Sequence, residues 1–170
     1  MRTRNETLFK WTLYGAAALL CFLVQGAFLQ RISLWGVIPF LFPVIAAVGA
    51  SYEAPVPGTI FALVIGVLCD LLLPELFPCF YTLAFPLVGL AATLISQSLL
   101  PAGIICSLAV SALAFLITDL GRCLLLWING TPAWSAGAFL MLRELCITLP
   151  LVLPVTLLFR MVHRRTHLDD

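Results

Sequence analysis

Long apolar runs separated by short breaks containing proline or polar residues make up nearly the whole chain. Each run reaches the roughly 20 residues that an α-helix needs to cross the hydrocarbon core of a bilayer. The helices that this pattern predicts cover residues 11–30, 32–52, 55–74, 76–100, 102–128 and 138–162. We therefore expect an all-α integral membrane protein, folded as one compact bundle of six transmembrane helices with short loops.

Composition agrees with this interpretation and excludes other classes of protein. Of 170 residues, 62% are hydrophobic and 10% are charged, and the mean hydropathy is +1.12, so no soluble domain is expected. A net charge of +1 gives no argument for nucleic acid as a partner. The first run is too long for the apolar part of a cleaved signal peptide, so we expect an uncleaved anchor.

The positions of lysine and arginine predict the orientation in the membrane. If the N-terminus is cytoplasmic, six of these cations lie beside the spans on the cytoplasmic side and only Arg31 lies outside. Because cations beside transmembrane helices favour the cytoplasm, both chain ends are predicted to be cytoplasmic.

Within the run GTIFALVIGVLCDLLLP, small residues and one acid recur at every fourth position. Gly58, Ala62, Gly66 and Asp70 lie on one slowly turning face of the predicted helix. Small residues at this spacing allow a second helix to approach closely in a bilayer. The face is a candidate helix-docking surface, either for another protein or for the chain's own helices.

Apart from Arg160, which lies at the cytoplasmic end of the last span, five charged residues lie inside the predicted spans, where ionisable groups are costly and suggest a function. They are Asp70, Asp119, Arg122, Arg143 and Glu144. All five fall in the outer half of the membrane at about 1.5 Å of rise per residue. Asp119 and Arg122 can pair within one helix. We expect one polar cluster in which Arg143 reaches Asp70 or Asp119 and Glu144 reaches Arg122.

The chain offers little support for catalysis or for a metal or cofactor. The six cysteines are scattered singly, without a C-x-x-C pattern, and are expected to be buried apolar side chains. An intramembrane aspartic protease would use Asp70 and Asp119 as its pair of carboxyls. Their flanks, VLCDLLL and LITDLGR, lack the short signatures of such families. We expect a protein that is not an enzyme and holds neither metal nor cofactor.

The order of these parts resembles the rod shape-determining protein MreD family over essentially the whole chain. The similarity rests on FLVQGAFLQ in the first helix, an early proline in the second, GTIFALVIGVLCDLLL in the third, FLITDLGR in the fifth and a basic tail. It carries over to Gly58, Gly66, Asp70 and Asp119. The chain departs from the family at Ala62, where glycine is usual, and at LLLPELFPCF, where a turn containing glycine is usual.

The resemblance implies a non-enzymatic scaffold subunit of the cell-elongation complex in the bacterial plasma membrane. Its implied partner is the bitopic protein MreC, through which it would link the actin-like MreB filament to the peptidoglycan synthases. One alternative is the substrate-binding subunit of an energy-coupling-factor vitamin transporter, although the first span lacks the A-x-x-x-A face of such subunits. A proton or ion carrier that uses the acidic residues is a third possibility.

Overall fold

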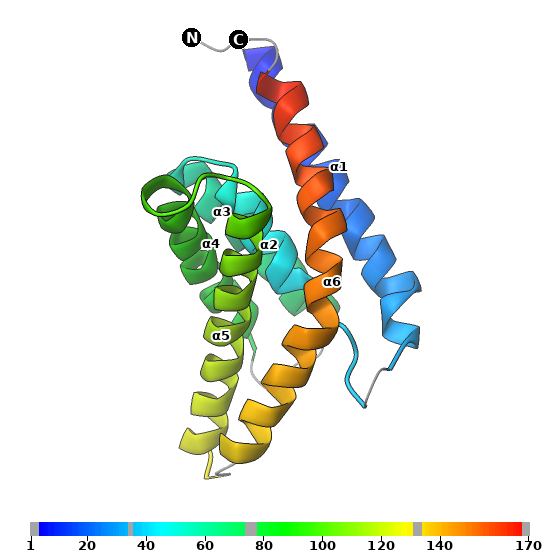
Figure 1. Ribbon diagram of the computed structural model, residues 1–170, viewed down its shortest axis with the longest axis vertical. Helices are drawn as coiled ribbons and strands as arrows, with labels where there is room; N and C mark the ends of the chain where they lie inside the picture. Colours follow the sequence, from blue (N-terminus) through cyan, green and yellow to red (C-terminus); the bar gives the residue numbers. More distant parts are fainter. Residues whose placement is uncertain (1–3, 34–35, 74–77, 131–133, 168–170) are drawn as a thin grey trace.

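The computed structural model describes residues 4–33, 36–73, 78–130 and 134–167 (Figure 1). The helices are α1 (Arg4–Ala27), the short 3-10 helix η1 (Leu29–Arg31), α2 (Phe42–Ser51), α3 (Pro55–Leu72), α4 (Phe80–Ser98), α5 (Ile104–Ile128) and α6 (Trp134–His167). All except α2 and η1 are long and apolar enough to cross a membrane. This all-helical architecture is compatible with a helical membrane bundle.

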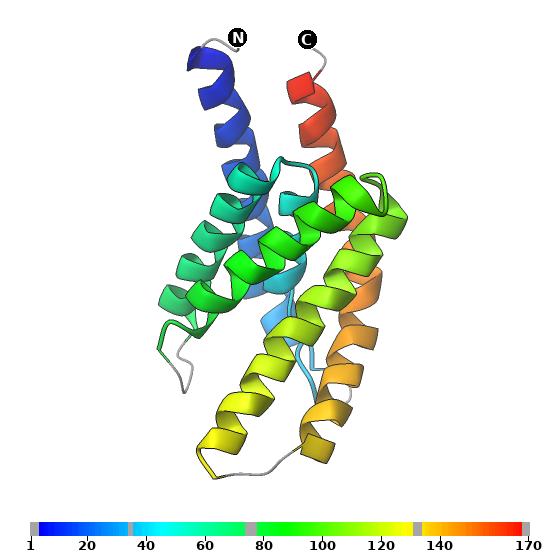
Figure 2. The ribbon, with the colours of Figure 1, turned by 90° about the vertical axis from the view of Figure 1, so that its left-hand side faces the viewer.

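The helices alternate in direction along the bundle. Figure 2 shows α1 and α6 reaching the end of the molecule at which both chain termini lie. From that end α3 and α5 run away, and α4 and α6 run back. The first and the last helix therefore have their outer ends at the same end of the bundle.

The second predicted helix is wrong in its first half. A helix was predicted over residues 32–52, but α2 begins only at Phe42, and residues 36–41 are not helical. Pro39 and Pro43 are the physical cause, because proline has no N–H and disfavours helical geometry in the preceding residue. Pro43 lies in the first turn of α2, where it can begin a helix without losing an internal hydrogen bond.

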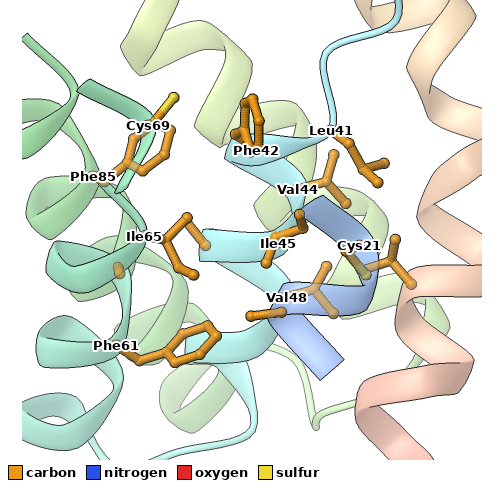
Figure 3. Close-up of a cluster of buried hydrophobic side chains, with 14 of the residues drawn as sticks. Cys21, Leu41, Phe42, Val44, Ile45, Val48, Phe61, Ile65, Cys69 and Phe85 are labelled. Carbon is orange, nitrogen blue, oxygen red and sulfur yellow. The ribbon is translucent and has the colours of Figure 1, made fainter. Parts of the chain in front are cut away.

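All ten residues of α2 are buried, so this short helix forms the centre of the bundle. Figure 3 shows Ile45 and Val48 of α2 beside Phe61 and Ile65 of α3. The non-helical segment before α2 is also attached to its neighbours. The side chain of Gln25 donates to the carbonyl of Pro39 at 2.8 Å and accepts from the N–H of Leu41 at 3.0 Å.

Aromatic rings connect α1 to the rest of the bundle near the end that carries the termini. Tyr14 of α1 is fully buried. Its ring centroid lies 5.9 Å from that of Phe61 on α3 and 5.8 Å from that of Phe159 on α6. These contacts hold α1 against two helices that are distant in the sequence.

Candidate functional site

The predicted docking face of α3 is covered by the chain's own helices. Gly58, Ala62 and Gly66 are buried, and α3 and α4 form a closely packed antiparallel pair (Figure 2). A methyl group added at Gly89 of α4 would lie 2.6 Å from Cβ of Ala62. The structure thus favours the internal alternative for this face, with α4 in the position where a partner helix was considered.

The two glycines of this face allow unusually close packing. A Cβ atom at Gly66 would lie 2.5 Å from the backbone oxygen of Tyr81. At Gly58 it would lie 2.6 Å from Cγ2 of Thr93. Because a larger residue would overlap its neighbours, the spacing of small residues sets the α3–α4 separation.

Asp70, the fourth residue of the face, binds the beginning of α4. One carboxylate oxygen accepts from the N–H of Tyr81 at 3.1 Å. The other accepts from the N–H of Thr82 at 2.7 Å and from its hydroxyl at 2.6 Å. A carboxylate here satisfies N–H groups that have no partner within the helix and interacts favourably with the helix dipole. Asp70 therefore joins the end of α3 to the first turn of α4.

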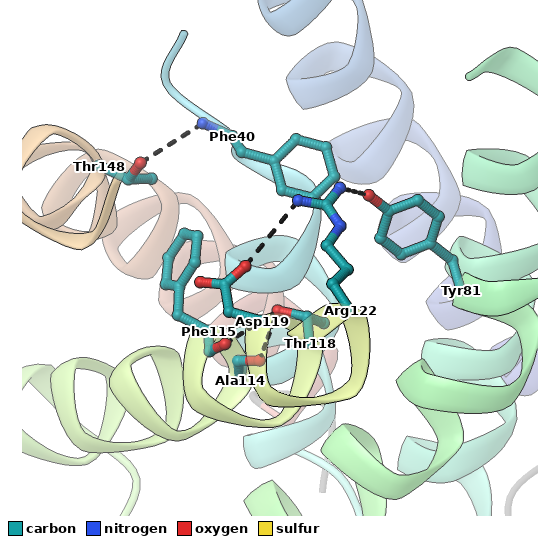
Figure 4. A network of polar contacts seen from close by, with 8 residues as sticks. All are labelled: Phe40, Tyr81, Ala114, Phe115, Thr118, Asp119, Arg122 and Thr148. Carbon is teal, nitrogen blue, oxygen red and sulfur yellow. Dashed lines mark hydrogen bonds and ion pairs between the residues drawn. The ribbon is translucent and has the colours of Figure 1, made fainter. Parts of the chain in front are cut away.

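Asp119 and Arg122 pair within α5, as their spacing predicts, with 3.8 Å between Oδ1 and Nη1. Figure 4 shows the Arg122 guanidinium between the rings of Phe40 and Tyr81, with 5.4 Å from its central carbon to each ring centroid. Arg122 also donates a hydrogen bond to the hydroxyl of Tyr81. Since the backbone N–H of Tyr81 binds Asp70, this tyrosine connects the two predicted acidic positions.

The predicted contacts of Arg143 with Asp70 or Asp119 are not found among the described residues. The contacts of Asp70 are with α4, and Asp119 pairs with Arg122. Arg143 instead lies over the ring of Phe139, one turn earlier in α6, at 4.7 Å from the centroid. The sequence analysis considered charged side chains alone, whereas α4 supplies backbone N–H donors to Asp70. The contact between Glu144 and Arg122 stays a prediction.

A buried ion pair that the sequence analysis did not identify lies near the termini. Nζ of Lys10 is 2.5 Å from Oε2 of Glu53, and the two side chains are only 11% and 4% exposed. Beside Glu53, the ring of Tyr52 contacts the ring of His163 of α6 in a tilted arrangement, with 5.3 Å between the ring centroids. The turn between α2 and α3 therefore contacts both α1 and α6. The only sign of this pair in the sequence is that Lys10 precedes the first predicted span and Glu53 follows the second, which puts opposite charges on the same predicted side of the membrane.

An open apolar groove lies between α1 and α3, with a volume of about 660 Å³. Its α1 wall runs from Trp11 to Gly26, with Gln30 of η1 beyond it, and its α3 wall runs from Ile60 to Leu72, with Leu73 just after the helix. Side chains on both walls are largely exposed, including Leu19 at 64% and Ile60 at 53%. This groove is not the docking surface predicted from the sequence, because it is formed by the other side of α3.

Two glycines of α1 lie in the wall of this groove. Gly15 and Gly26 both line it, and a Cβ atom at either position would have no neighbour within 4 Å. They differ in this respect from Gly58 and Gly66. The backbone of α1 is therefore accessible to close approach from the groove.

Among the described residues, no three histidine, cysteine or acidic side chains come together in a way that could hold a metal ion. Comparison with protein-family models, curated proteins and solved structures found no match to this chain.

Proposed function

We propose that this protein is a non-enzymatic scaffold subunit of the bacterial cell-elongation complex. In this proposal it lies in the plasma membrane with both chain ends in the cytoplasm and binds the bitopic protein MreC. Through MreC it links the MreB filament to the enzymes that synthesise peptidoglycan. The proposal combines the resemblance to the MreD family with a surface that fits a single transmembrane helix.

The open groove between α1 and α3 is the observation that carries the proposal. Its lining is almost entirely apolar, with Gln30 as the polar exception at one end. Gly15 and Gly26 leave space above the α1 backbone, and small residues promote helix association in a bilayer, where water does not drive it. A partner helix in this groove would contact both α1 and α3.

The length of the groove favours a helix over a lipid chain. From Trp11 to Gly26 the α1 wall spans about 22 Å, and from Ile60 to Leu72 the α3 wall spans about 18 Å, at 1.5 Å per residue. A hydrocarbon core is about 30 Å thick, so an acyl chain from one leaflet reaches only about half of it. We therefore place the transmembrane helix of MreC in this groove.

The proposal can be tested by capture of partners from mild detergent with the full-length tagged chain. Gly15→Leu and Gly26→Leu place a bulky side chain in the groove, at positions where the added Cβ atom meets no neighbour within 4 Å. Leu83→Trp is the matched control, because Leu83 is 73% exposed on α4 and does not line the groove. We expect the unmodified chain and the control to recover the MreC-like protein, and both glycine variants to lose it while remaining monodisperse.

Mass spectrometry of the same samples separates the proposal from its alternative. Recovery of MreC and cell-wall enzymes without a small molecule supports the scaffold. Recovery of a vitamin with an ATPase complex would overturn it in favour of a transporter subunit. Retained capture by both well-folded glycine variants would show that the partner binds elsewhere.

A further inference from the structure

The ion pair between Lys10 and Glu53 joins the two walls of the groove at one end. Lys10 directly precedes Trp11, the first groove residue of α1, and Glu53 lies two residues before α3 begins at Pro55. The 2.5 Å contact between their charged groups therefore links α1 to the turn that leads into α3. Lys10 also lies over the ring of Tyr14, with Nζ 5.9 Å from the centroid.

A second polar attachment holds α1 farther along the groove. The two hydrogen bonds of Gln25 bind the segment before α2. Lys10 and Gln25 are about 22 Å apart along the helix at 1.5 Å per residue. Between these attachments α1 presents the open groove surface that contains Gly15. The helix is thus held by polar contacts at two points, and its apolar wall between them faces the space that a partner would occupy.

Burial makes the ion pair a strong constraint on the position of α1. Loss of either partner would leave a charge in a site that is almost closed to water, and an unpaired buried charge is strongly unfavourable. Movement of α1 away from the turn is therefore opposed, unlike separation of an exposed pair, which has little effect.

We propose that Lys10 and Glu53 are positioning residues that hold α1 and α3 at the separation required for a partner helix to enter the groove. This inference rests on the proposed function, since it assumes that the groove binds a helix. The ion pair itself does not contact the partner. The ion pair holds α1 in place before the partner binds, so that moving α1 reduces the binding free energy only a little.

The test compares Lys10→Met and Glu53→Gln with the double variant Lys10→Glu/Glu53→Lys, which reverses the pair. Affinity for the full-length, fluorescently labelled MreC-like partner is measured with the full chain in nanodiscs. If either single change leaves α1 correctly placed about one tenth of the time, the apparent affinity falls about tenfold. We expect such a loss in both single variants and recovery in the reversed pair. Unchanged affinity in well-folded single variants would overturn the proposal.

If the single variants do not fold, the distance between α1 and α3 can be measured in the chain that keeps the native ion pair. A ketone-bearing amino acid replaces Leu20 of α1 and Leu71 of α3, and each ketone is labelled with a nitroxide. This chemistry leaves the native cysteines in place. Both positions are exposed, at 53% and 76%. We expect the same narrow distance distribution with and without the partner. A shift on binding would show that the partner, and not the ion pair, sets the separation.

The same data distinguish failure of this inference from failure of the proposed function. If the unmodified chain does not bind the partner, the proposed function is wrong. If Gly15→Leu weakens binding but Lys10→Met and Glu53→Gln do not, the groove is the site and the ion pair has only a structural role.

Discussion

Replacement of Gly66 by alanine tests the packing of α3 on α4, with Gly15→Ala as its matched control. Both changes place alanine in a helix, which favours the helix by about 1 kcal/mol over glycine. Only the methyl group at Gly66 meets a neighbour, the backbone oxygen of Tyr81 at 2.5 Å. At Gly15 the methyl group meets nothing within 4 Å.

The size of the effect follows from that contact. Carbon and oxygen atoms in close contact are normally about 3.3 Å apart or more, so α4 must move by nearly 1 Å at Tyr81. Overpacking of this kind costs about 1–3 kcal/mol, and the obstacle here is backbone that is held by Asp70. Because the helix-propensity gain is common to both variants, we expect Gly66→Ala to be less stable than Gly15→Ala by about 2–3 kcal/mol.

Reversible unfolding in mixed micelles, followed by helical circular dichroism during titration with sodium dodecyl sulfate, measures this difference. Equal free energies of unfolding for the two variants would refute the close α3–α4 packing and reopen this face to a partner. The same reasoning predicts that Gly66→Leu disrupts the helix pair itself, so loss of partner capture in that variant would carry no information about docking.

Three further predictions concern the polar contacts and are measured by the same unfolding titration. Asp70→Ala removes three hydrogen bonds at the beginning of α4 and should lower stability by about 2 kcal/mol. When Thr82→Val is added to Asp70→Ala, it should lower stability little further. If each change lowers stability by the same amount with or without the other, the contact between Asp70 and Thr82 is contradicted. Tyr81→Phe removes the hydroxyl that binds Arg122 while keeping the ring, and should cost about 1–2 kcal/mol, so wild-type stability would argue against that bond. Gln25→Leu leaves a buried carbonyl and N–H unsatisfied and should cost about 2–4 kcal/mol, with faster amide exchange over residues 36–41; unchanged exchange would show that another group holds this segment.

The helices were the most predictable part of the fold, because bilayer-length apolar runs have few alternative structures. The predicted bounds for α3, residues 55–74, differ by only two residues from Pro55–Leu72. The exception was the second run, where hydropathy is uniform but the backbone is not helical before Phe42. The backbone groups of this segment form hydrogen bonds with side chains instead. The partners are the Gln25 amide of α1 and the Thr148 hydroxyl of α6.

The candidate site was predictable only where partners are close in sequence. Asp119 and Arg122 are three residues apart in one helix and pair as expected. Asp70 was correctly selected as a residue in need of a partner, but its donors are backbone groups that become available only where α4 begins. Lys10 and Glu53 are 43 positions apart in the sequence, so no local pattern indicates their pairing.

The sequence by itself determined that the chain forms apolar helices of membrane length, which of their faces carry small residues and which charged residues interrupt the apolar runs. These properties follow from composition and from the 3.6-residue period of a helix. Only the tertiary structure decided that α4 covers the face at Gly66, and that the glycines of α1 face open space. The physical reason is that small residues permit close packing without specifying the neighbour, which is set by how all the helices fit together.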